Sequence, residues 1–253
     1  MHVITYDYPL NAQIRMLLKL THLFDRLYSY VGQDNPNAHH AALMTLFEVL
    51  DITVRDDIKS DLIMALERQR QALIVLRDNP KVDQEPLEKT LAELELAVNN
   101  CQQTKGKFGE YLRNHEWLMS VKQRSTIPGG LCDFDAPPYH YWLMQHAQTR
   151  RQELLNWIGP MESTWQAMQV QLSLLKDSGK SQSLTAVKGA FQQARVGAEA
   201  KLLRVQLDES LACTPEISAN KYMLNIRFLQ LGVSTRGNVY NDDVPFNLIT
   251  CSF

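Results

Sequence analysis

The chain has 253 residues, a formal net charge of −2 at pH 7 and 45% hydrophobic residues. This length is enough to bury a sizeable core in one or two domains, and the composition is ordinary for a folded protein. The near-zero charge excludes a bulk electrostatic attraction to nucleic acid or to an anionic membrane, so we expect neither as a partner.

The cysteines and the start of the chain indicate the compartment. The four cysteines are widely spaced and form no CxxC pair, which argues against zinc binding and redox chemistry. The opening MHVITYDYPLN lacks the basic residues and the apolar run of a secretory signal. No apolar run approaches the roughly 20 residues needed to span a bilayer. We therefore expect a reduced, cytoplasmic protein that does not insert into a membrane.

The apolar residues of the first half repeat at helical spacing. Asn11 is predicted to cap a first helix, and NPNAHH ends its pattern before a second helix begins. Ser60 is predicted to cap a third helix, which DNPKVD ends as a turn. The apolar positions of the first helix are Ile14, Leu17, Phe24 and Val31.

Two longer apolar stripes follow, with alternating spacings of three and four residues. Such stripes are typical of the core of a helical bundle, although a stripe can also form the seam of an oligomer. The second stripe opens on Gly159-Pro160, with the proline near the helix start. The first comprises Leu87, Leu91, Leu94, Val98 and Cys101, and the second Met161, Trp165, Met168, Leu172 and Leu175.

The last third of the chain changes to a period of two, which predicts strands. DDVPFNLITCSF predicts a final strand, in which Pro245 favours a strand start or an edge position. The polar stretch 176–197 between the helices and the strands is expected to be a mobile connection. The predicted buried faces are Leu203, Val205 and Leu207 in one strand and Tyr222, Leu224, Ile226 and Phe228 in another.

The stretch RSTIPGGLCDFDAPPYHYWL, residues 124–143, interrupts the helices. Pro128, Gly129 and Gly130 cannot continue a helix, and the glycines are expected to serve backbone geometry. LCDFD then alternates like a short strand that could join the later ones, so that the stretch would be a structural joint.

The predicted fold class is therefore α+β, with an N-terminal helical bundle domain and a C-terminal antiparallel β-strand domain, both built from discontinuous segments. The predicted helical domain comprises residues 1–122 and 140–178. The predicted β-strand domain comprises residues 123–139 and 179–253.

Catalysis and metal binding find little support in the sequence. Cys132, Asp135 and His140 are the residue types of a nucleophile, an orienting group and a base, but their spacing matches no cysteine-protease signature. His39 and His40 are adjacent, so on a helix they point about 100° apart and cannot share a metal as an i, i+4 pair does. No HExxH, GxxxxGK[ST] or GxGxxG motif occurs. We expect a binding protein without catalytic residues, cofactor or metal.

Four segments, spread over nearly the whole chain, resemble the ZapD family of cell division proteins. They are YPLNAQIRMLLKL, VLDITVRDDIKSDLIMALERQRQAL, VKQRSTIPGGLCDFDAPPYHYWL and ISANKYMLNIRF, the third being the most specific. The resemblance implies a non-enzymatic, cytoplasmic homodimer that is recruited to the division site at midcell. It implies binding to the C-terminal tail of the tubulin-like protein FtsZ and bundling of FtsZ filaments during Z-ring assembly. It also implies a helical domain with a β-strand domain.

An acidic and apolar tail requires a groove with basic residues. Arg227 and Lys221 lie on the strand face opposite Leu224, and Glu116 stands where the family pattern leads us to expect a basic residue. Arg227 and Lys221 could instead be solvated strand residues without a role. Arg124 could instead form a structural ion pair with Asp133 or Asp135. The predicted tail-binding residues are Arg227, Lys221, Arg124, Lys122, Arg113, His140, Arg55 and Lys19.

Two rival functions remain open at this point. The protein could be a helical adaptor whose apolar stripes engage another partner, with the basic patch incidental. It could also be a hydrolase that uses Cys132 and His140.

Overall fold

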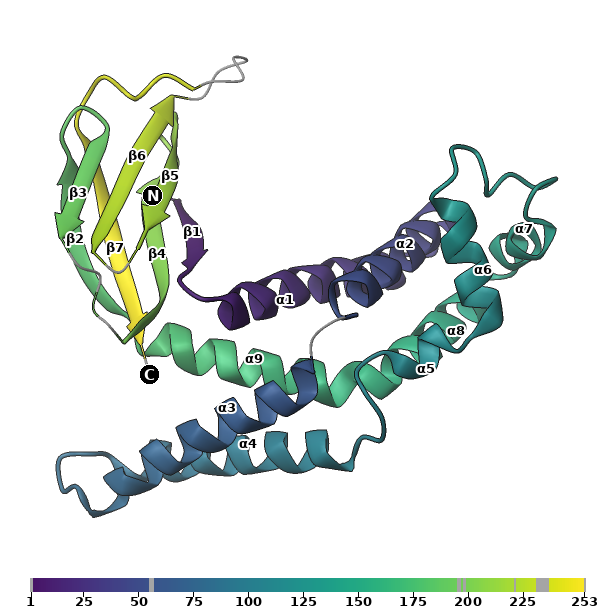
Figure 1. Cartoon of the computed structure of the whole chain (residues 1–253), viewed down its shortest axis with the longest axis horizontal. Helices are drawn as coiled ribbons and strands as arrows, with labels where there is room; N and C mark the ends of the chain where they lie inside the picture. The colour runs from purple at the N-terminus through teal and green to yellow at the C-terminus, as the bar shows by residue number, and fades with distance from the viewer. Residues whose placement is uncertain are drawn as a thin grey trace. The chain divides into compact units, whose positions relative to one another are not determined.

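The computed structural model describes residues 2–54, 57–194, 197, 199–220, 222–230 and 237–252 (Figure 1). Helices occupy the first two thirds and antiparallel strands the last third, which confirms the predicted α+β class. The chain forms two compact units. The helical unit is Lys19–Gln171, and the β unit is Met1–Leu18 with Leu172–Phe253.

The helices run in chain order from α1 to α9, with two short 3₁₀ helices, η1 and η2. None of the described helices is long and apolar enough to cross a membrane. Their bounds are α1 (Ala12–Val31), α2 (Pro36–Ile52), α3 (Ile58–Ile74), η1 (Val75–Asp78), α4 (Gln84–Gln103), α5 (Glu110–Arg113), α6 (Glu116–Ser125), α7 (Pro137–Met144), α8 (Ala147–Ile158), η2 (Gly159–Met161) and α9 (Glu162–Asp177).

Side-chain caps fix where several of these helices begin. The Asn11 Oδ1 atom accepts the backbone N–H of Ile14 at 2.8 Å, which confirms the predicted cap of α1. The predicted cap of the third helix is wrong. Asp57 caps α3, and its carboxylate accepts the backbone N–H of Ser60 at 3.3 Å. The helix therefore begins two residues before the serine that we expected to cap it.

The predicted apolar stripes are largely buried. In α4 the stripe from Leu87 to Cys101 lies inside, as predicted for a bundle core. Phe24 is completely buried at the middle of α1, and its ring stacks on Trp165 with centroids 5.7 Å apart. These contacts make the helical unit cohere around aliphatic and aromatic side chains.

A buried arginine fastens the turn between α1 and α2 to the junction of α7 and α8. Arg150 is 3% exposed and donates to the carbonyl oxygens of Asp34 at 3.1 Å and Leu143 at 3.0 Å, and to that of Gln145. Its Nε also donates to His39 Nδ1 at 3.0 Å. Burial, and then the charge of Arg150, hold the pKa of His39 below its ordinary value, so the imidazole stays neutral and can accept this bond.

The strands of the β unit form two sheets that share one core. The first has the order β1-β4-β7-β2 and the second β3-β6-β5, and all paired strands are antiparallel. Side chains from both sheets make one buried cluster, which includes Val205, Ile226 and Phe246. The strands are β1 (Val3–Pro9), β2 (Lys180–Ala186), β3 (Ala190–Ala194), β4 (Ala200–Asp208), β5 (Cys213–Ala219), β6 (Met223–Gln230) and β7 (Val244–Ser252).

The strands predicted from alternation are confirmed as β4, β6 and β7, with one residue misplaced. Leu224, Ile226 and Phe228 face the core as predicted, but Tyr222 precedes β6 and is 69% exposed. Pro245 is the second residue of β7, which fits a strand start. The alternative, an edge position, does not apply, because β7 lies between β4 and β2.

Other strands escaped prediction, and one predicted strand is absent. Residues 176–197, expected to be a mobile connection, contain β2 and β3. Residues 131–135 form turns between α6 and α7, so the predicted short strand there is wrong. The whole stretch 123–139, which we assigned to the β-strand domain, falls in the helical unit, and residues 1–18 fall in the β unit.

Candidate functional site

Two of the predicted basic residues converge on the C-terminal end of α2. The Arg113 guanidinium donates to the carbonyl oxygens of Phe108 at 3.0 Å and Leu50 at 3.1 Å, and to Thr53 Oγ1 at 2.7 Å. Lys122 Nζ lies 2.7 Å from Asp51 Oδ1. Cations at this end complement the helix dipole. Arg113 is thus engaged within the helical unit, whereas Lys122 is half-buried and forms one ion pair among the described residues, with Asp51.

The other basic candidates are dispersed. Lys19 on α1, Arg124 on α6 and His140 on α7 are exposed in the helical unit. Arg227 belongs to the β unit, where its side chain is 60% exposed and donates to Glu216 Oε2 at 2.7 Å. Arg55 and Lys221 lie outside the described residues.

Pro128, Gly129 and Gly130 lie in a run of successive turns after α6. The backbone N–H of Gly130 donates to the carbonyl oxygen of Ile127 at 2.9 Å, and that of Cys132 donates to Gly129 at 3.0 Å. Gly129 has a φ of 74°, a conformation that favours glycine. Gly130 is buried, and a Cβ there would lie 2.5 Å from the Arg124 carbonyl oxygen. The two glycines therefore serve different needs.

The side chains of Cys132, Asp135 and His140 do not form a catalytic arrangement. All three residues are described and exposed, and no hydrogen bond joins their side chains to one another. Among the residues that the structure describes, no group of three or more His, Cys, Asp or Glu side chains could hold a metal ion.

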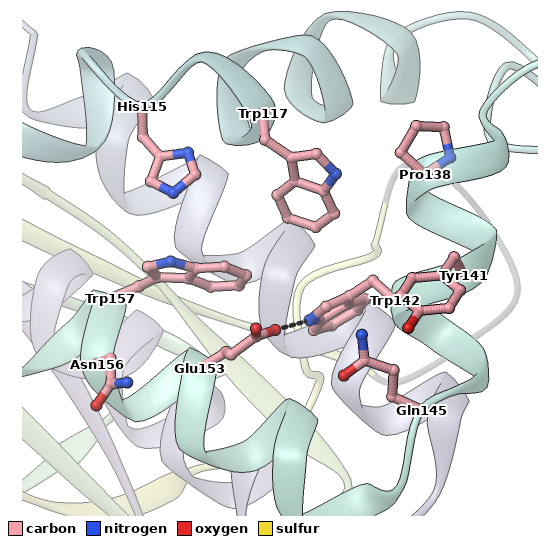
Figure 2. Close-up of a pocket in the computed structure, with 9 residues that line it drawn as sticks. All are labelled: His115, Trp117, Pro138, Tyr141, Trp142, Gln145, Glu153, Asn156 and Trp157. Carbon is pink, nitrogen blue, oxygen red and sulfur yellow. Dashed lines mark hydrogen bonds between the residues drawn. The ribbon is translucent and has the colours of Figure 1, made fainter.

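A concave aromatic surface lies between α6, α7 and α8, and none of the predicted tail-binding residues lines it (Figure 2). A pocket of about 590 Å³ is lined by Trp117 of α6, by Pro138, Tyr141 and Trp142 of α7, and by Glu153 and Trp157 of α8. Such a volume is in the range of small-molecule and peptide side-chain sites.

The tryptophans of this pocket form a compact triad. Ring centroids are 5.6 Å apart for Trp117 and Trp157, 5.9 Å for Trp117 and Trp142, and 6.1 Å for Trp142 and Trp157. The Trp142 indole N–H donates to Glu153 Oε2 at 2.6 Å, and Figure 2 shows this carboxylate between two of the rings. Tyr139 packs behind Trp142, and burial raises the pKa of its hydroxyl to about 12.

The positions of the tryptophans in the sequence are a weak indication of this pocket. Trp117, Trp142 and Trp157 are three of the four tryptophans, and they fall within three consecutive helices of one unit. Trp142 is only 4% exposed, so most of its ring is buried. The pocket depends on the crossing of the three helices, and no local pattern encodes that crossing.

The chain is similar to known proteins of one family. The model of a family described as "ZapD: Cell division protein" matches residues 18–227. Cell division protein ZapD of Chromobacterium violaceum is 46% identical over 252 residues, covering 99% of this chain and 100% of that protein. The ZapD proteins of Nitrosomonas europaea and Cupriavidus necator are 45% and 46% identical, over 99% of this chain and 95% and 100% of their own lengths. The chain therefore belongs to the ZapD family of cell division proteins.

Proposed function

We propose that the protein binds the C-terminal tail of FtsZ and, as a homodimer, bundles FtsZ filaments to promote Z-ring assembly and septum formation. Its place of action would be the cytoplasm at midcell. The observation that carries this proposal is the 45–46% identity to ZapD proteins over 99% of the chain. A filament cross-linker needs two tail sites, and two-fold pairing of identical chains is the commonest way to supply them.

The basic residues contribute to the proposal in different degrees. Arg124 and Lys19 are exposed and have no ion pair among the described residues, so their charge is available to an acidic tail. Lys122 and His140, also on the helical unit, are further proposed contacts for the tail. Arg113 is the weaker candidate, because three of its hydrogen bonds go to its own unit. Arg55 and Lys221 remain candidates from the sequence.

The decisive experiment is sedimentation of FtsZ polymers with this protein, using full-length FtsZ and FtsZ that lacks its C-terminal tail. We expect the protein to pellet with full-length polymers and to stay in the supernatant with the truncated ones. Sedimentation velocity of the protein alone should give a dimer at micromolar concentration. Equal pelleting with both forms of FtsZ would refute tail binding, and a monomer would refute the cross-linking dimer.

The cross-strand pair of Arg227 and Glu216 provides a paired charge test. If Arg227 contributes to the tail groove, Arg227→Gln should weaken binding of a tail peptide, and Glu216→Gln should strengthen it by freeing the guanidinium. Both positions are exposed, so each change should alter the free energy of unfolding by less than about 0.5 kcal/mol. Peptide affinity at low and high salt is the measurement, because salt screens exposed charges over about 8–10 Å. Unchanged affinity in both variants would remove Arg227 from the groove.

A further inference from the structure

The aromatic pocket between α6, α7 and α8 carries a negative charge, whereas an acidic tail requires a surface with positive charge. Glu153 supplies the only carboxylate among the residues that line the pocket. One of its oxygens accepts the Trp142 indole N–H, and no lysine or arginine of the described residues forms an ion pair with it. The pocket therefore offers a carboxylate next to three indole rings, and its lining includes no lysine or arginine.

The spacing of the tryptophans decides where a ligand can lie. With centroids 5.6–6.1 Å apart, a point equidistant from the three rings is only about 3.4 Å from each centroid. This is no more than one van der Waals contact distance, so no group fits between the rings. A ligand must lie on the open side of the triad, against ring faces and beside Glu153 (Figure 2).

Aromatic faces and a carboxylate together favour a planar organic cation. The negative faces of indole rings attract a cation within about 6 Å of the ring centroid. A guanidinium can stack on such a face while it donates two parallel hydrogen bonds to a carboxylate, which an ammonium cannot do. The volume of about 590 Å³ exceeds the need of a single charged group and leaves room for neighbouring peptide atoms.

The rim of the pocket suits a protein surface. Tyr141, which lines it, is 71% exposed, and Met144, one turn further along α7, is 60% exposed. Aromatic residues, methionine and arginine are enriched at the centres of protein interfaces. We propose that this pocket binds an arginine side chain presented by a partner protein. This binding site is additional to the proposed site for an acidic tail, whose charge Glu153 would repel.

The test uses the full-length protein and a matched pair of small probes. N-acetyl-arginine methylamide supplies the guanidinium, and the corresponding citrulline amide has nearly the same shape without the charge. We expect the arginine probe to change tryptophan fluorescence saturably, and the citrulline probe to bind about tenfold more weakly. The indole N–H resonances of Trp117, Trp142 and Trp157 should shift, while that of Trp165, which lies outside the pocket, should not.

Glu153→Gln removes the charge and keeps an oxygen that can accept the Trp142 indole N–H, so the pocket should stay intact. We expect this variant to bind the arginine probe about tenfold more weakly and no longer to distinguish it from citrulline. Glu116→Gln is the matched control, because it removes an exposed carboxylate next to Trp117 that does not line the pocket, and binding should be unchanged. Equal affinities for the two probes, or full binding by Glu153→Gln, would overturn the proposal. Weaker self-association of Glu153→Gln would overturn the assignment to another protein, since the arginine would then come from a second copy of this chain.

Discussion

Replacing Arg150 by leucine should lower the free energy of unfolding of the helical unit by about 3 kcal/mol. Arg150 is almost completely buried and is the donor for carbonyl oxygens of Asp34, Leu143 and Gln145. Leucine would leave these partly buried acceptors without their donor, and an acceptor that is left unsatisfied out of reach of water costs about 1–3 kcal/mol. It would also leave His39 Nδ1 without the hydrogen bond from Arg150.

Urea unfolding followed by tryptophan fluorescence measures this effect selectively. All four tryptophans lie between residues 117 and 165, so the signal reports on the helical unit alone. Arg124→Gln is the control, because Arg124 is exposed and such a change usually alters stability by less than about 0.5 kcal/mol. If Arg150→Leu unfolds at the same urea concentration as the parent, the carbonyl oxygens are satisfied by other donors and our account of this junction is wrong.

Replacing Gly130 by valine should destabilise the helical unit by about 1–3 kcal/mol, towards the upper end of the range for an overpacked site. The added Cβ would lie 2.5 Å from the Arg124 carbonyl oxygen and 2.9 Å from Ile127 Cβ. Neither atom belongs to the far end of a flexible side chain, so the turn after α6 must shift. The cause is steric contact, whereas we had attributed the need for both glycines to backbone geometry.

The neighbouring glycine supplies the control. Gly129 has the positive φ, and asparagine is among the few residues that adopt this conformation readily. Gly129→Asn should therefore cost less than about 1 kcal/mol. Thermal melting of both variants, beside tail-peptide affinity, separates structure from contact. An unchanged melting temperature in Gly130→Val, together with lost tail binding, would mean that the turn touches the partner directly.

The elements that could be predicted from the sequence are those whose burial imposes a period on the residues. The stripe of α4 and the alternation in β4 and β6 each reflect one buried face. The missed strands lie on the edges of their sheets, as β1, β2, β3 and β5 do, and their outer positions are exposed. Many of their inward side chains, such as Tyr6, Phe191 and Ile217, are only partly buried against the core, so polar residues are tolerated nearby and the period of two is weaker.

The site was harder to predict than the fold, for a related reason. The sequence shows which side chains are basic. Only the structure shows that Arg113 donates hydrogen bonds to backbone carbonyl oxygens and that Arg227 donates to Glu216. The segment LCDFD alternates without being a strand, because the turns after α6 use its backbone groups locally. Short-range pattern cannot distinguish these cases when the deciding contact lies on another element.

The order of the strands determines when each unit can fold during synthesis of the chain. β1 is synthesised before the helical unit, yet its partner β4 begins at Ala200, after the entire helical unit. β7, which is synthesised after the other described strands, lies between β4 and β2 and provides the pairing edge for both. Domains that are completed early can fold during synthesis. The helical unit can therefore fold while β1 is still without its partner strand β4. A nascent chain arrested before Val244 would carry bare edges on β2 and β4, which chaperones and proteases recognise as incomplete.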